Sequence, residues 1–585
     1  MDPAFLGVSQ SLTGRRWQGP AAETLRRAEQ LAQETGLPAA VCGVLAERDV
    51  APAEISQYLS PKIRDLLPDP RRLKDASVAA ERLNAAVERA ERVAIFADYD
   101  VDGGASAALL INWLRQLGRG ATLYVPDRID EGYGPNAPAM AELAAAHDLI
   151  ICVDCGTLSH DALAAAGGLA DVIVLDHHLG AETLPPALAV VNPNRQDETG
   201  DLGHLCAAAV VFLVLVDARR QRKAAGATAP DLMECLDLVA LATVADVAPL
   251  IGVNRAFVKQ GLKVMAGRGR PGLVALADTA KLDSAPKSYH LGYVLGPRIN
   301  AGGRIGQADL GAQLLSTDDA GAARVLAERL EALNAERREI ETAVRTSALA
   351  QAEARGDTGP LVWAAGDHWH PGVIGIVAAR LKETFGRPAL VFGFDDASGK
   401  GSGRSVPGVD LGAAIQRLAR DGFIEKGGGH RMAAGLSLRR DQLEPAMARL
   451  SELLARQGPG QEGAASLRIN GLLLPEAASV SLVETLEQAG PYGAAAPAPR
   501  FAFPDCRILD VRQIGQGHLK LRFGDGHSKP NEAVAFGAWE SELGIGLAKQ
   551  TGALFHLAGR LELNSWGGRT TVQLSLEDAA PAGVP

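Results

Sequence analysis

Acidic residues and histidines follow directly after four apolar stretches of this chain. The stretches end at Asp98, Asp154, Asp176 and Asp246, and two of them continue as Asp98-Tyr99-Asp100-Val101-Asp102 and Asp176-His177-His178. So many carboxylates gathered at one place would repel one another, and bound cations relieve that repulsion. Mixed carboxylate and imidazole ligands suit Mn²⁺ or a similar divalent ion. The chemistry to expect from these residues is therefore that of a metal site.

The first three stretches have the composition of β-strands. They span residues 93–97, 149–153 and 172–175, are rich in Val and Ile, and stop at a charged residue. In a parallel sheet, the residues just past the strand ends converge on one edge, where ligands bind. The fourth stretch, residues 231–247, is predicted to be a buried helix, as is the segment 204–220.

Each cluster alone has an ordinary structural explanation. Alternating aspartates often form a turn or cap a helix, and Gly103 and Gly104 predict such a turn here. A histidine pair often lies in a polar loop. Four clusters in one sheet topology favour a metal site, and two metals about 3.5–4 Å apart are a standard device for phosphoester hydrolysis. Asp154, alone on its strand, is then the candidate bridging carboxylate, and one imidazole would donate to a phosphate or leaving group.

The bulk composition limits the class of protein. At 585 residues, the chain is expected to hold three or four domains of about 100–200 residues each. Its net charge of -10 argues against a sequence-blind nucleic-acid coat protein, although a local basic lining can coexist with an acidic whole. Six cysteines make no disulfide framework in so long a chain. Because the sequence has no signal-peptide segment and no apolar run of membrane length, we expect a soluble, cytoplasmic protein.

The order of predicted elements indicates an α/β fold class with two α/β domains joined by a long helix and followed by an OB-like β-barrel. Strands alternate with helices over residues 90–195, which favours a parallel, doubly wound sheet. Short alternating strands near the C-terminus suggest the barrel. The expected boundaries are an N-terminal extension at 1–75, a catalytic domain at 76–318, the connecting helix at 319–357, a second α/β domain at 358–455 and the barrel at 465–580.

Several segments together resemble a known family. DYDVDG (98–103), VDCGT (153–157), DHH (176–178) and TVADV (243–247) look like the four motifs of the DHH phosphoesterase superfamily. GPRINAGGR (296–304), HPGVIGIVAAR (370–380), GSGRS (401–405) and GGGHRMAAG (427–435) resemble the RecJ family, the single-strand-specific DNA exonucleases of bacteria. The resemblance covers about residues 90–435, and the long helix and terminal barrel fit the same family layout.

The resemblance implies a metal centre and an activity. The implied metal ligands are Asp98, Asp100, Asp102, Asp154, His177 and Asp246, and the implied catalytic residues are His178, Asp154 and His177. Members of this family degrade single-stranded DNA from the 5′ end and release mononucleotides, with two Mn²⁺ ions or with Mg²⁺ as a substitute, in DNA repair and recombination. The resemblance also implies a monomer whose partners include a single-strand-binding protein and a RecQ-type helicase.

A second set of residues is expected to hold the DNA. Arg298 and Arg304 flank Asn300 in a predicted Gly-rich loop, where guanidinium groups suit phosphates. The glycine-rich segment around Ser402 and Arg404 is predicted to form a backbone nest for a terminal phosphate. The other candidates, for which a tight surface turn or a structural side chain is the ordinary explanation, are Arg128, Tyr133, His370, Gly429 and His430. At most two or three barrel aromatics are expected to contact bases, out of Phe501, Phe503, Phe523, Phe536, Trp539 and Trp566.

Two rival functions stay open on the sequence alone. One is a small-molecule DHH enzyme, such as a cyclic-dinucleotide or short-oligonucleotide phosphodiesterase or a pyrophosphatase. A small substrate needs no strand track, so the barrel and the long helix argue against it. The other is a catalytically dead subunit that recruits replication or repair partners, and the intact set of predicted ligands argues against that.

Overall fold

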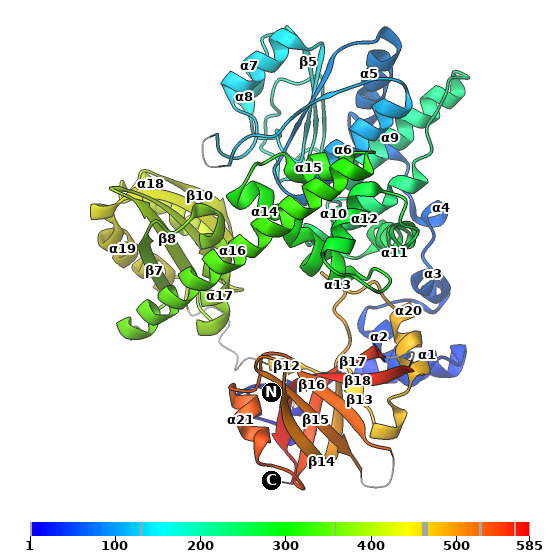
Figure 1. Cartoon of the computed structure of the whole chain (residues 1–585), viewed down its shortest axis with the longest axis vertical. Coiled ribbons are helices and arrows are strands. Elements are labelled where there is room, and N and C mark those ends of the chain that lie inside the picture. Colours follow the sequence, from blue (N-terminus) through cyan, green and yellow to red (C-terminus); the bar gives the residue numbers. More distant parts are fainter. Residues whose placement is uncertain are drawn as a thin grey trace. The chain divides into compact units, whose positions relative to one another are not determined.

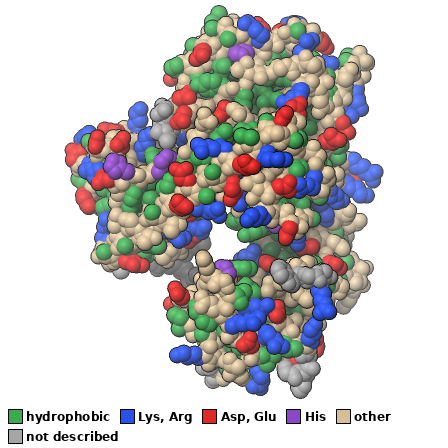
Figure 2. Space-filling view, viewed as in Figure 1, with side chains coloured by type: hydrophobic (Ala, Val, Ile, Leu, Met, Phe, Trp, Pro, Cys, Tyr) green, Lys and Arg blue, Asp and Glu red, His purple; other side chains and the backbone are tan. Residues whose placement is uncertain are grey.

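The computed structural model describes residues 3–128, 131–356, 359–458, 466–525, 529–566 and 569–583. The chain divides into two compact units, one of Met1–Leu66, Leu250–Lys259 and Glu462–Pro585, the other of Leu67–Pro249 and Gln260–Gln461. Acidic and basic side chains are interspersed on the face seen in Figure 2. Within the described ranges, no helix is both long enough and apolar enough to cross a membrane.

The second unit begins with a five-stranded parallel sheet (Figure 1). Its strands in spatial order are β3 (Thr122–Tyr124), β2 (Val93–Ala97), β4 (Leu149–Val153), β5 (Asp171–Leu175) and β6 (Ala189–Val191). Every residue of β2 and β4 is buried, which explains their continuous apolar sequences. The predicted strands and the parallel, doubly wound sheet are confirmed.

Helices cover both faces of this sheet (Figure 1). They are α5 (Ala76–Arg89), α6 (Val101–Gln116), α7 (Ala137–Ala146), α8 (His160–Ala164), α9 (Ala207–Ala224) and α10 (Leu236–Ala245). α7 and α8 share one core with strand residues such as Phe96 and Cys152. α5, α6 and α9 lie on the other face, and α10 packs against α6 and α9. The two buried helices predicted after the sheet are therefore present as α9 and α10.

A helical region follows the sheet. Its elements are α11 (Gly252–Ala266), α12 (Pro271–Thr279), α13 (Ser288–His290), the π-helical turn η5 (Leu291–Leu295), α14 (Gly296–Ile305), α15 (Leu310–Ser316) and α16 (Ala320–Arg355). The Gly-rich loop predicted at 296–304 is wrong, because these residues form α14. A Cβ added at Gly303 would lie 2.7 Å from the carbonyl oxygen of Tyr99, so this glycine lets α14 approach the aspartate-rich turn.

The second unit ends in another α/β region. Helix α16 connects this region to the helical region that precedes it. The sheet order is β10 (Lys426–His430), β11 (Ala433–Arg439), β9 (Ser398–Arg404), β8 (Ala389–Asp395) and β7 (Val362–Asp367), with α17 (Pro371–Phe385), α18 (Leu411–Arg420) and α19 (Leu443–Ala455). The predicted backbone nest around Ser402 is wrong, because that segment is β9, paired with β8 and β11. A Cβ at Gly401 would lie 2.4 Å from the ring of Phe392, so the glycine makes room for an aromatic core.

The first unit contains the predicted OB-like barrel. Its strands are β13 (Gly471–Leu472), β14 (Phe501–Ile514), β15 (His518–Gly524), β16 (Asn531–Ala535), β17 (Leu554–Trp566) and β18 (Arg569–Pro581). β14 pairs with both β15 and β17, and β18 pairs with both β16 and β17, so the sheet closes on itself. α20 (Val480–Gln488) and α21 (Glu542–Ala548) accompany the barrel.

The N-terminal segment belongs to this same unit. Its main helices are α1 (Ala22–Thr35), α2 (Ala39–Glu47) and α3 (Ile55–Leu59), and β1 (Arg16–Gln18) pairs with β12 (Ser466–Arg468). Leu31 and Leu45 share a buried core with barrel residues such as Phe503. Arg255, at the start of α11, donates hydrogen bonds to the carbonyl oxygens of Tyr58 at 3.2 Å, Ala489 at 3.0 Å and Gly490 at 2.8 Å. Three segments distant in sequence are thus held together.

Candidate functional site

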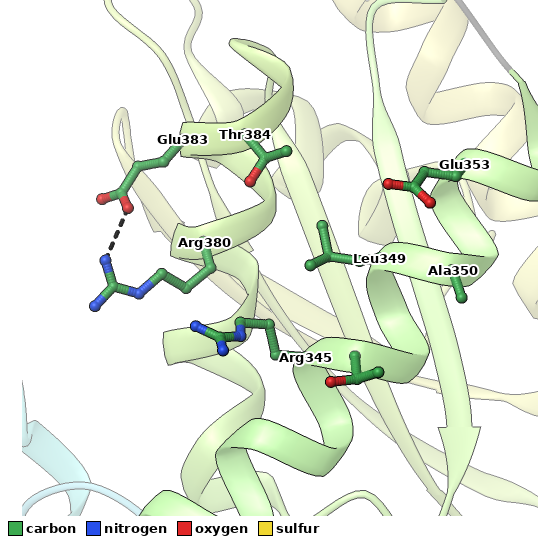
Figure 3. A pocket seen from close by; sticks show the side chains of 8 residues that line it. Arg345, Leu349, Ala350, Glu353, Arg380, Glu383 and Thr384 are labelled. Atoms are coloured by element: carbon green, nitrogen blue, oxygen red, sulfur yellow. Dashed lines mark hydrogen bonds and ion pairs between the residues drawn. The ribbon is translucent and has the colours of Figure 1, made fainter. Parts of the chain in front are cut away.

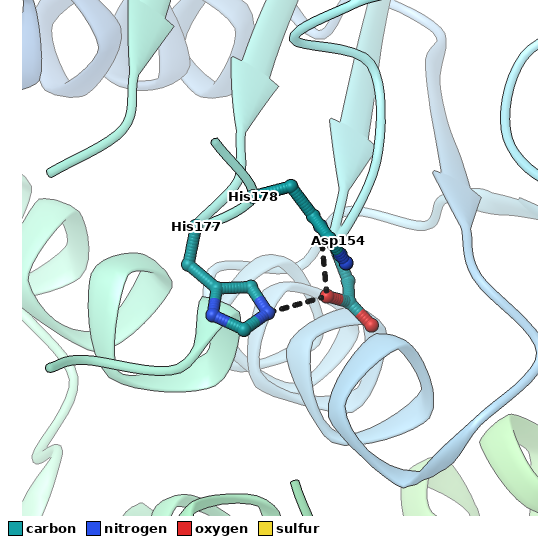
Figure 4. A group of neighbouring side chains, drawn as sticks. All are labelled: Asp154, His177 and His178. Carbon is teal, nitrogen blue, oxygen red and sulfur yellow. Dashed lines mark ion pairs between the residues drawn. The ribbon is translucent and has the colours of Figure 1, made fainter. Parts of the chain in front are cut away.

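The ends of β2, β4 and β5 and the end of α10 bring the predicted acidic and histidine residues together. Their ligand atoms form three overlapping groups, each within 4.8 Å: Asp98, Asp100 and Asp154; Asp154, His177 and His178; Asp102, His177 and Asp246. His177 Nε2 lies 3.3 Å from Asp154 Oδ1 (Figure 4) and 3.7 Å from Asp102 Oδ2. All six predicted ligands therefore lie in one connected cluster, and Asp154 and His177 each belong to two of its groups.

Backbone hydrogen bonds orient two of the aspartates. Asp100 caps α6, because its Oδ1 accepts from the N–H groups of Asp102 at 2.8 Å and Gly103 at 3.1 Å. Asp102 accepts from the N–H groups of Ala207 at 2.7 Å and Ala208 at 2.8 Å, at the start of α9. The positive ends of two helices thus help to hold two carboxylates beside each other. Asp100 therefore both caps α6 and belongs to the acidic cluster.

Asp154 adopts a conformation that is unusual for its residue type. Its φ is +59°, in the left-handed region that non-glycine residues seldom occupy and that is found more often at functional sites. Asp154 Oδ1 and Asp98 Oδ1 are buried and have no hydrogen-bond partner among the described residues. A buried carboxylate oxygen without a donor is costly. Within the described residues, no hydrogen bond therefore compensates the burial of these two oxygens.

Burial raises the pKa of Asp98, Asp154 and Asp246, and repulsion between carboxylates adds to the effect. Asp100 raises the pKa of Asp98 further, and both Asp100 and Asp102 act on Asp154. The pKa of Asp246 rises to about 8 through burial and the same two neighbours. Divalent cations would offset both causes, and carboxylate oxygens with one or two imidazoles suit Mn²⁺ or Mg²⁺. The residues present therefore fit such cations.

Asp176 positions His178, a role that the sequence argument missed. Asp176 Oδ1 lies 2.8 Å from His178 Nδ1 and accepts from the backbone N–H groups of His177 and His178. Burial lowers the pKa of His178, but the Asp176 partner outweighs it and raises that pKa to about 9. Tyr133 donates to the carbonyl oxygen of Asp154 at 3.0 Å and lies 3.1 Å from His178 Nδ1. The aspartate of the DHH motif was the available signal, because its carboxylate can accept a hydrogen bond from the ring of the histidine two residues later.

Three arginines from different elements form a second charged cluster, which we call the basic cluster. Arg128 follows β3, Arg304 lies near the end of α14, and Arg404 ends β9. Burial lowers the pKa of Arg304, to about 10, and that of Arg404, and repulsion from Arg128 contributes to both. Arg304 donates to the carbonyl oxygen of Gly372 at 3.1 Å. Like charges crowded in this way suit an anion such as a phosphate.

Two further candidates lie beside this basic cluster. His370 caps α17: its Nδ1 accepts from the N–H of Gly372 at 3.0 Å, so in the neutral ring Nε2 carries the proton. Ser402 Oγ accepts from Arg404 Nη1 at 3.2 Å, which joins the serine to the guanidinium group. Both side chains are partly exposed. A serine hydroxyl, an imidazole N–H and arginines are thus available to one anion.

The remaining candidates have different surroundings. Arg298 pairs with Glu331 of α16 and donates to the carbonyl oxygen of Val294 at 2.7 Å, so its guanidinium already has structural partners. Asn300 Oδ1 is buried without a hydrogen-bond partner among the described residues. Gly429 and His430 are exposed at the end of β10.

The barrel aromatics are mostly core, as expected. Phe501, Phe503 and Phe523 are buried, Trp539 is partly buried, and Phe536 is 67% exposed. The side chain of Trp566 lies outside the described residues. Among the described aromatics of this set, Phe536 is therefore the main candidate for base contact.

A hollow of about 590 Å³ between α16 and α17 lies apart from this chemistry (Figure 3). It is lined by Arg345, Thr346, Leu349, Ala350, Glu353, Arg380, Glu383 and Thr384. Arg380 pairs with Glu383 at 3.0 Å. Within the described ranges, the groups of side chains suited to a metal lie at the strand ends and not here.

Three family models match the chain. The model of the DHH family, N-terminal domain, matches residues 92–243, the DHHA1 domain matches 358–456, and the RecJ OB domain matches 469–578. Together they span the sheet with the acidic cluster except Asp246, the second α/β region and the barrel.

Known proteins match nearly the whole chain. A single-stranded-DNA-specific exonuclease RecJ from Dickeya dadantii (strain 3937) is 37% identical over 565 residues, which cover 93% of this chain and 96% of the relative. Crystal structures of RecJ from Thermus thermophilus in complex with Mn²⁺ and with Mg²⁺ match with TM-scores of 0.80 and 0.75, at 28% and 26% identity. Each covers 97% of this chain, which spans 80% and 79% of those chains, respectively. The chain belongs to the RecJ family.

Proposed function

We propose that the chain is a single-stranded-DNA-specific exonuclease that hydrolyses phosphodiester bonds with divalent cations. One observation supports this most: in a member of the RecJ family, Asp98 and Asp154 each keep a buried carboxylate oxygen without a hydrogen-bond partner among the described residues. The relative from Dickeya dadantii carries the name of this activity. A dead binding subunit would have no need to maintain so costly an arrangement.

The acidic cluster would hold the cations. The proposed ligands are Asp98, Asp100, Asp102, Asp154, His177 and Asp246. Bound there, divalent cations supply an activated water and offset the charge that develops on the phosphate. We propose that the cluster would hold two Mn²⁺ ions, with Mg²⁺ as a substitute, and that Asp154, which belongs to two of its groups, would be a ligand.

His178 would act on the substrate itself. Its Nδ1 lies 2.8 Å from Asp176 Oδ1, and this partner favours the protonated ring at neutral pH. The ring would donate a proton to the scissile phosphate or to the leaving oxygen. Tyr133 would hold the carbonyl of Asp154, and with it the position of that carboxylate.

The basic cluster would bind the terminal 5′-phosphate. Arg304, Arg404 and Ser402 would contact it directly, and a phosphate held there would set the length of the released product at one nucleotide. Degradation would then run from 5′ to 3′. The remaining proposed DNA contacts are Arg128, Tyr133, Asn300, His370, Gly429 and His430, whereas the Glu331 partner argues for a structural role of Arg298.

Several finer proposals follow from family membership. We propose that the protein works as a monomer in the cytoplasm, in DNA repair and recombination, with a single-strand-binding protein and a RecQ-type helicase as partners. The domain boundaries proposed remain 76–318, 319–357, 358–455 and 465–580. Residues 1–75 are less separate than proposed, because Met1–Leu66 share a unit with the barrel.

The first test is product release from single-stranded DNA labelled at the 5′ or the 3′ end, with Mn²⁺, beside a blunt duplex. Early mononucleotide from the 5′ label, with the duplex intact and the product lost in Asp154→Ala, is the expected result. Release from the 3′ end first would overturn the proposed polarity. Cleavage of small dinucleotides alone would favour a small-molecule phosphodiesterase, and hydrolysis of neither would favour a binding subunit.

A further inference from the structure

Two exposed tyrosines stack on each other in the helical segment that leads into α14. α13, η5 and α14 follow one another without a break. Tyr289 and Tyr293 are 64% and 73% exposed, and their ring centroids lie 5.1 Å apart at an interplanar angle of 24°. Because both rings remain largely exposed, the pair keeps aromatic surface open to a further flat ring. Exposed aromatic side chains are the groups on which nucleic-acid bases stack.

The backbone beneath the pair is unusual. Tyr293 lies in the π-helical turn η5, and Tyr289 lies in the short helix just before it. π-helical turns are rare and occur frequently at functional sites. The unusual turn and the exposed rings are two separate observations on the same segment.

This segment lies beside the acidic cluster. η5 packs against α10, whose last residue immediately precedes Asp246. A Cβ added at Gly296 would lie 3.4 Å from Ala245 Cβ. Val247, the residue after Asp246, is 70% exposed with a φ of +59°, a conformation that a β-branched side chain adopts only as an outlier. Exposed apolar side chains thus occur both next to Asp246 in sequence and on the element packed against its helix.

We propose that Tyr289 and Tyr293 form a stacking platform for bases of single-stranded DNA on the 3′ side of the bond that is cleaved. This inference rests on the proposed function. Arg304, at the far end of the same helical segment, belongs to the cluster assigned to the 5′-phosphate. It lies eleven positions after Tyr293, or roughly 16 Å at about 1.5 Å per residue. The platform and the phosphate cluster would therefore hold opposite ends of one short stretch of DNA.

Stacking also fits what such a substrate requires. Every base has an aromatic face, so a stacking platform tolerates any sequence, as a degradative enzyme must. Bases in a duplex are already paired and stacked, and so they are not available to the tyrosines. The platform would thereby add to the preference for single strands.

The test compares Tyr289→Ala/Tyr293→Ala with Tyr289→Phe/Tyr293→Phe, which keeps both rings and is the matched control. KM and kcat are measured with Mn²⁺ on a 5′-phosphorylated dinucleotide and on a 5′-phosphorylated 20-mer. The alanine variant should raise KM for the 20-mer roughly 5- to 160-fold, because stacking on an aromatic side chain is worth about 1–3 kcal/mol per base. Its kcat and its KM for the dinucleotide should stay within about twofold of wild type, and the phenylalanine variant should match wild type. A 20-mer that lacks its bases beyond the second nucleotide should have the same KM with wild type as with the alanine variant.

Two outcomes would overturn the platform. One is an unchanged KM of the alanine variant for the 20-mer. The other is an equal loss on dinucleotide and 20-mer, which indicates a structural role for the rings. Fluorescence anisotropy with the same oligonucleotides separates this inference from the proposed function, since it needs no hydrolysis. If wild type cleaves no DNA, the proposed function fails, and a loss of 20-mer binding in the alanine variant still decides whether the platform exists.

Discussion

The second unit holds one cluster of carboxylates and one cluster of arginines, and burial shifts their pKa values in opposite directions. Burial and repulsion raise the pKa of Asp154 and Asp246, and the same two causes lower the pKa of Arg304 and Arg404. Each cluster is shifted toward its neutral form, and an ion of opposite charge would relieve each. Cations would stabilise the charged carboxylates, and an anion would stabilise the charged guanidinium groups.

The two clusters also differ in how the chain builds them. Most of the acidic residues follow the ends of strands in one sheet, where the topology alone brings them together. The arginines come from a loop after β3, from α14 and from β9, which belong to separate layers. The predicted metal ligands thus come together at one sheet edge and the adjoining end of α10, whereas the predicted phosphate ligands meet only through packing between separate layers.

The largest loss of activity is expected from Asp154→Asn in the acidic cluster, because this change keeps the shape of the side chain and removes its charge. We expect exonuclease activity to fall roughly 10³-fold or more, because bound cations contribute several kcal/mol to the transition state. Initial rates on 5′-labelled single strands measure this. Asp161→Asn, at an exposed acid of α8, is the control and should match wild type. An active Asp154→Asn enzyme would contradict the assignment.

The corresponding change in the basic half is Arg404→Ala. Hydrogen bonds to charged groups contribute about 1.5–3 kcal/mol, so KM for 5′-phosphorylated single strands should rise roughly 10- to 100-fold. The same variant should lose any preference for a 5′-phosphate over a 5′-hydroxyl, which the two substrates measure side by side. Arg380→Ala, at the exposed pair with Glu383, should change neither value. A uniform loss on both substrates would indicate that Arg404 serves the fold alone.

A smaller loss of activity is expected from Asp176, whose carboxylate pairs with the protonated ring of His178. In Asp176→Asn, the pKa of His178 should fall from about 9 toward its ordinary 6.5, because the charge that raises it is gone. Loss of a partner that orients a catalytic or ligating histidine typically costs about 10- to 100-fold. Activity should drop most above pH 7, where the variant histidine loses its proton first. A pH–rate profile parallel to that of wild type would rule out this role.

The smallest effect concerns stability without metal. Asp246 has a pKa of about 8 in the folded chain against an ordinary 3.8, so between these values the folded state binds more protons than the unfolded state. Stability of the metal-free protein should therefore fall as pH rises through this window, and Mn²⁺ should raise Tm more at pH 8.5 than at pH 6. Thermal scans of wild type and Asp246→Asn measure this. The variant should show a shallower decline with pH, and an identical slope would contradict the assignment.

The sequence was sufficient for the acidic cluster because two local patterns fixed it. Apolar runs such as residues 93–97 form strands in most contexts, and strand ends in a parallel sheet share one edge. The position of Asp154 after β4 followed from that alone. Its positive φ did not, because nothing in the residue type indicates a left-handed conformation.

The rest depended on packing between distant segments. The glycine-rich segment 399–403 was predicted to form a backbone nest, yet it is part of β9, where Gly401 makes room for the ring of Phe392. Arg298 carries the residue type of a phosphate ligand, and only the position of Glu331 on α16 shows its actual partner. The association of residues 1–66 with the barrel had no local signal at all.

Helix α11 has a consequence for how this protein can be taken apart. Its residues up to Lys259 belong to one unit and those from Gln260 to the other, so the chain passes between units after Leu66, Pro249, Lys259 and Gln461. No single cut in the gene separates two complete modules. A fragment that ends at Gln461 keeps Arg255 but loses the carbonyl oxygens of Ala489 and Gly490 that accept its hydrogen bonds. Truncation or recombination after Gln461 therefore leaves an incomplete unit, and this constrains how such an architecture can be engineered.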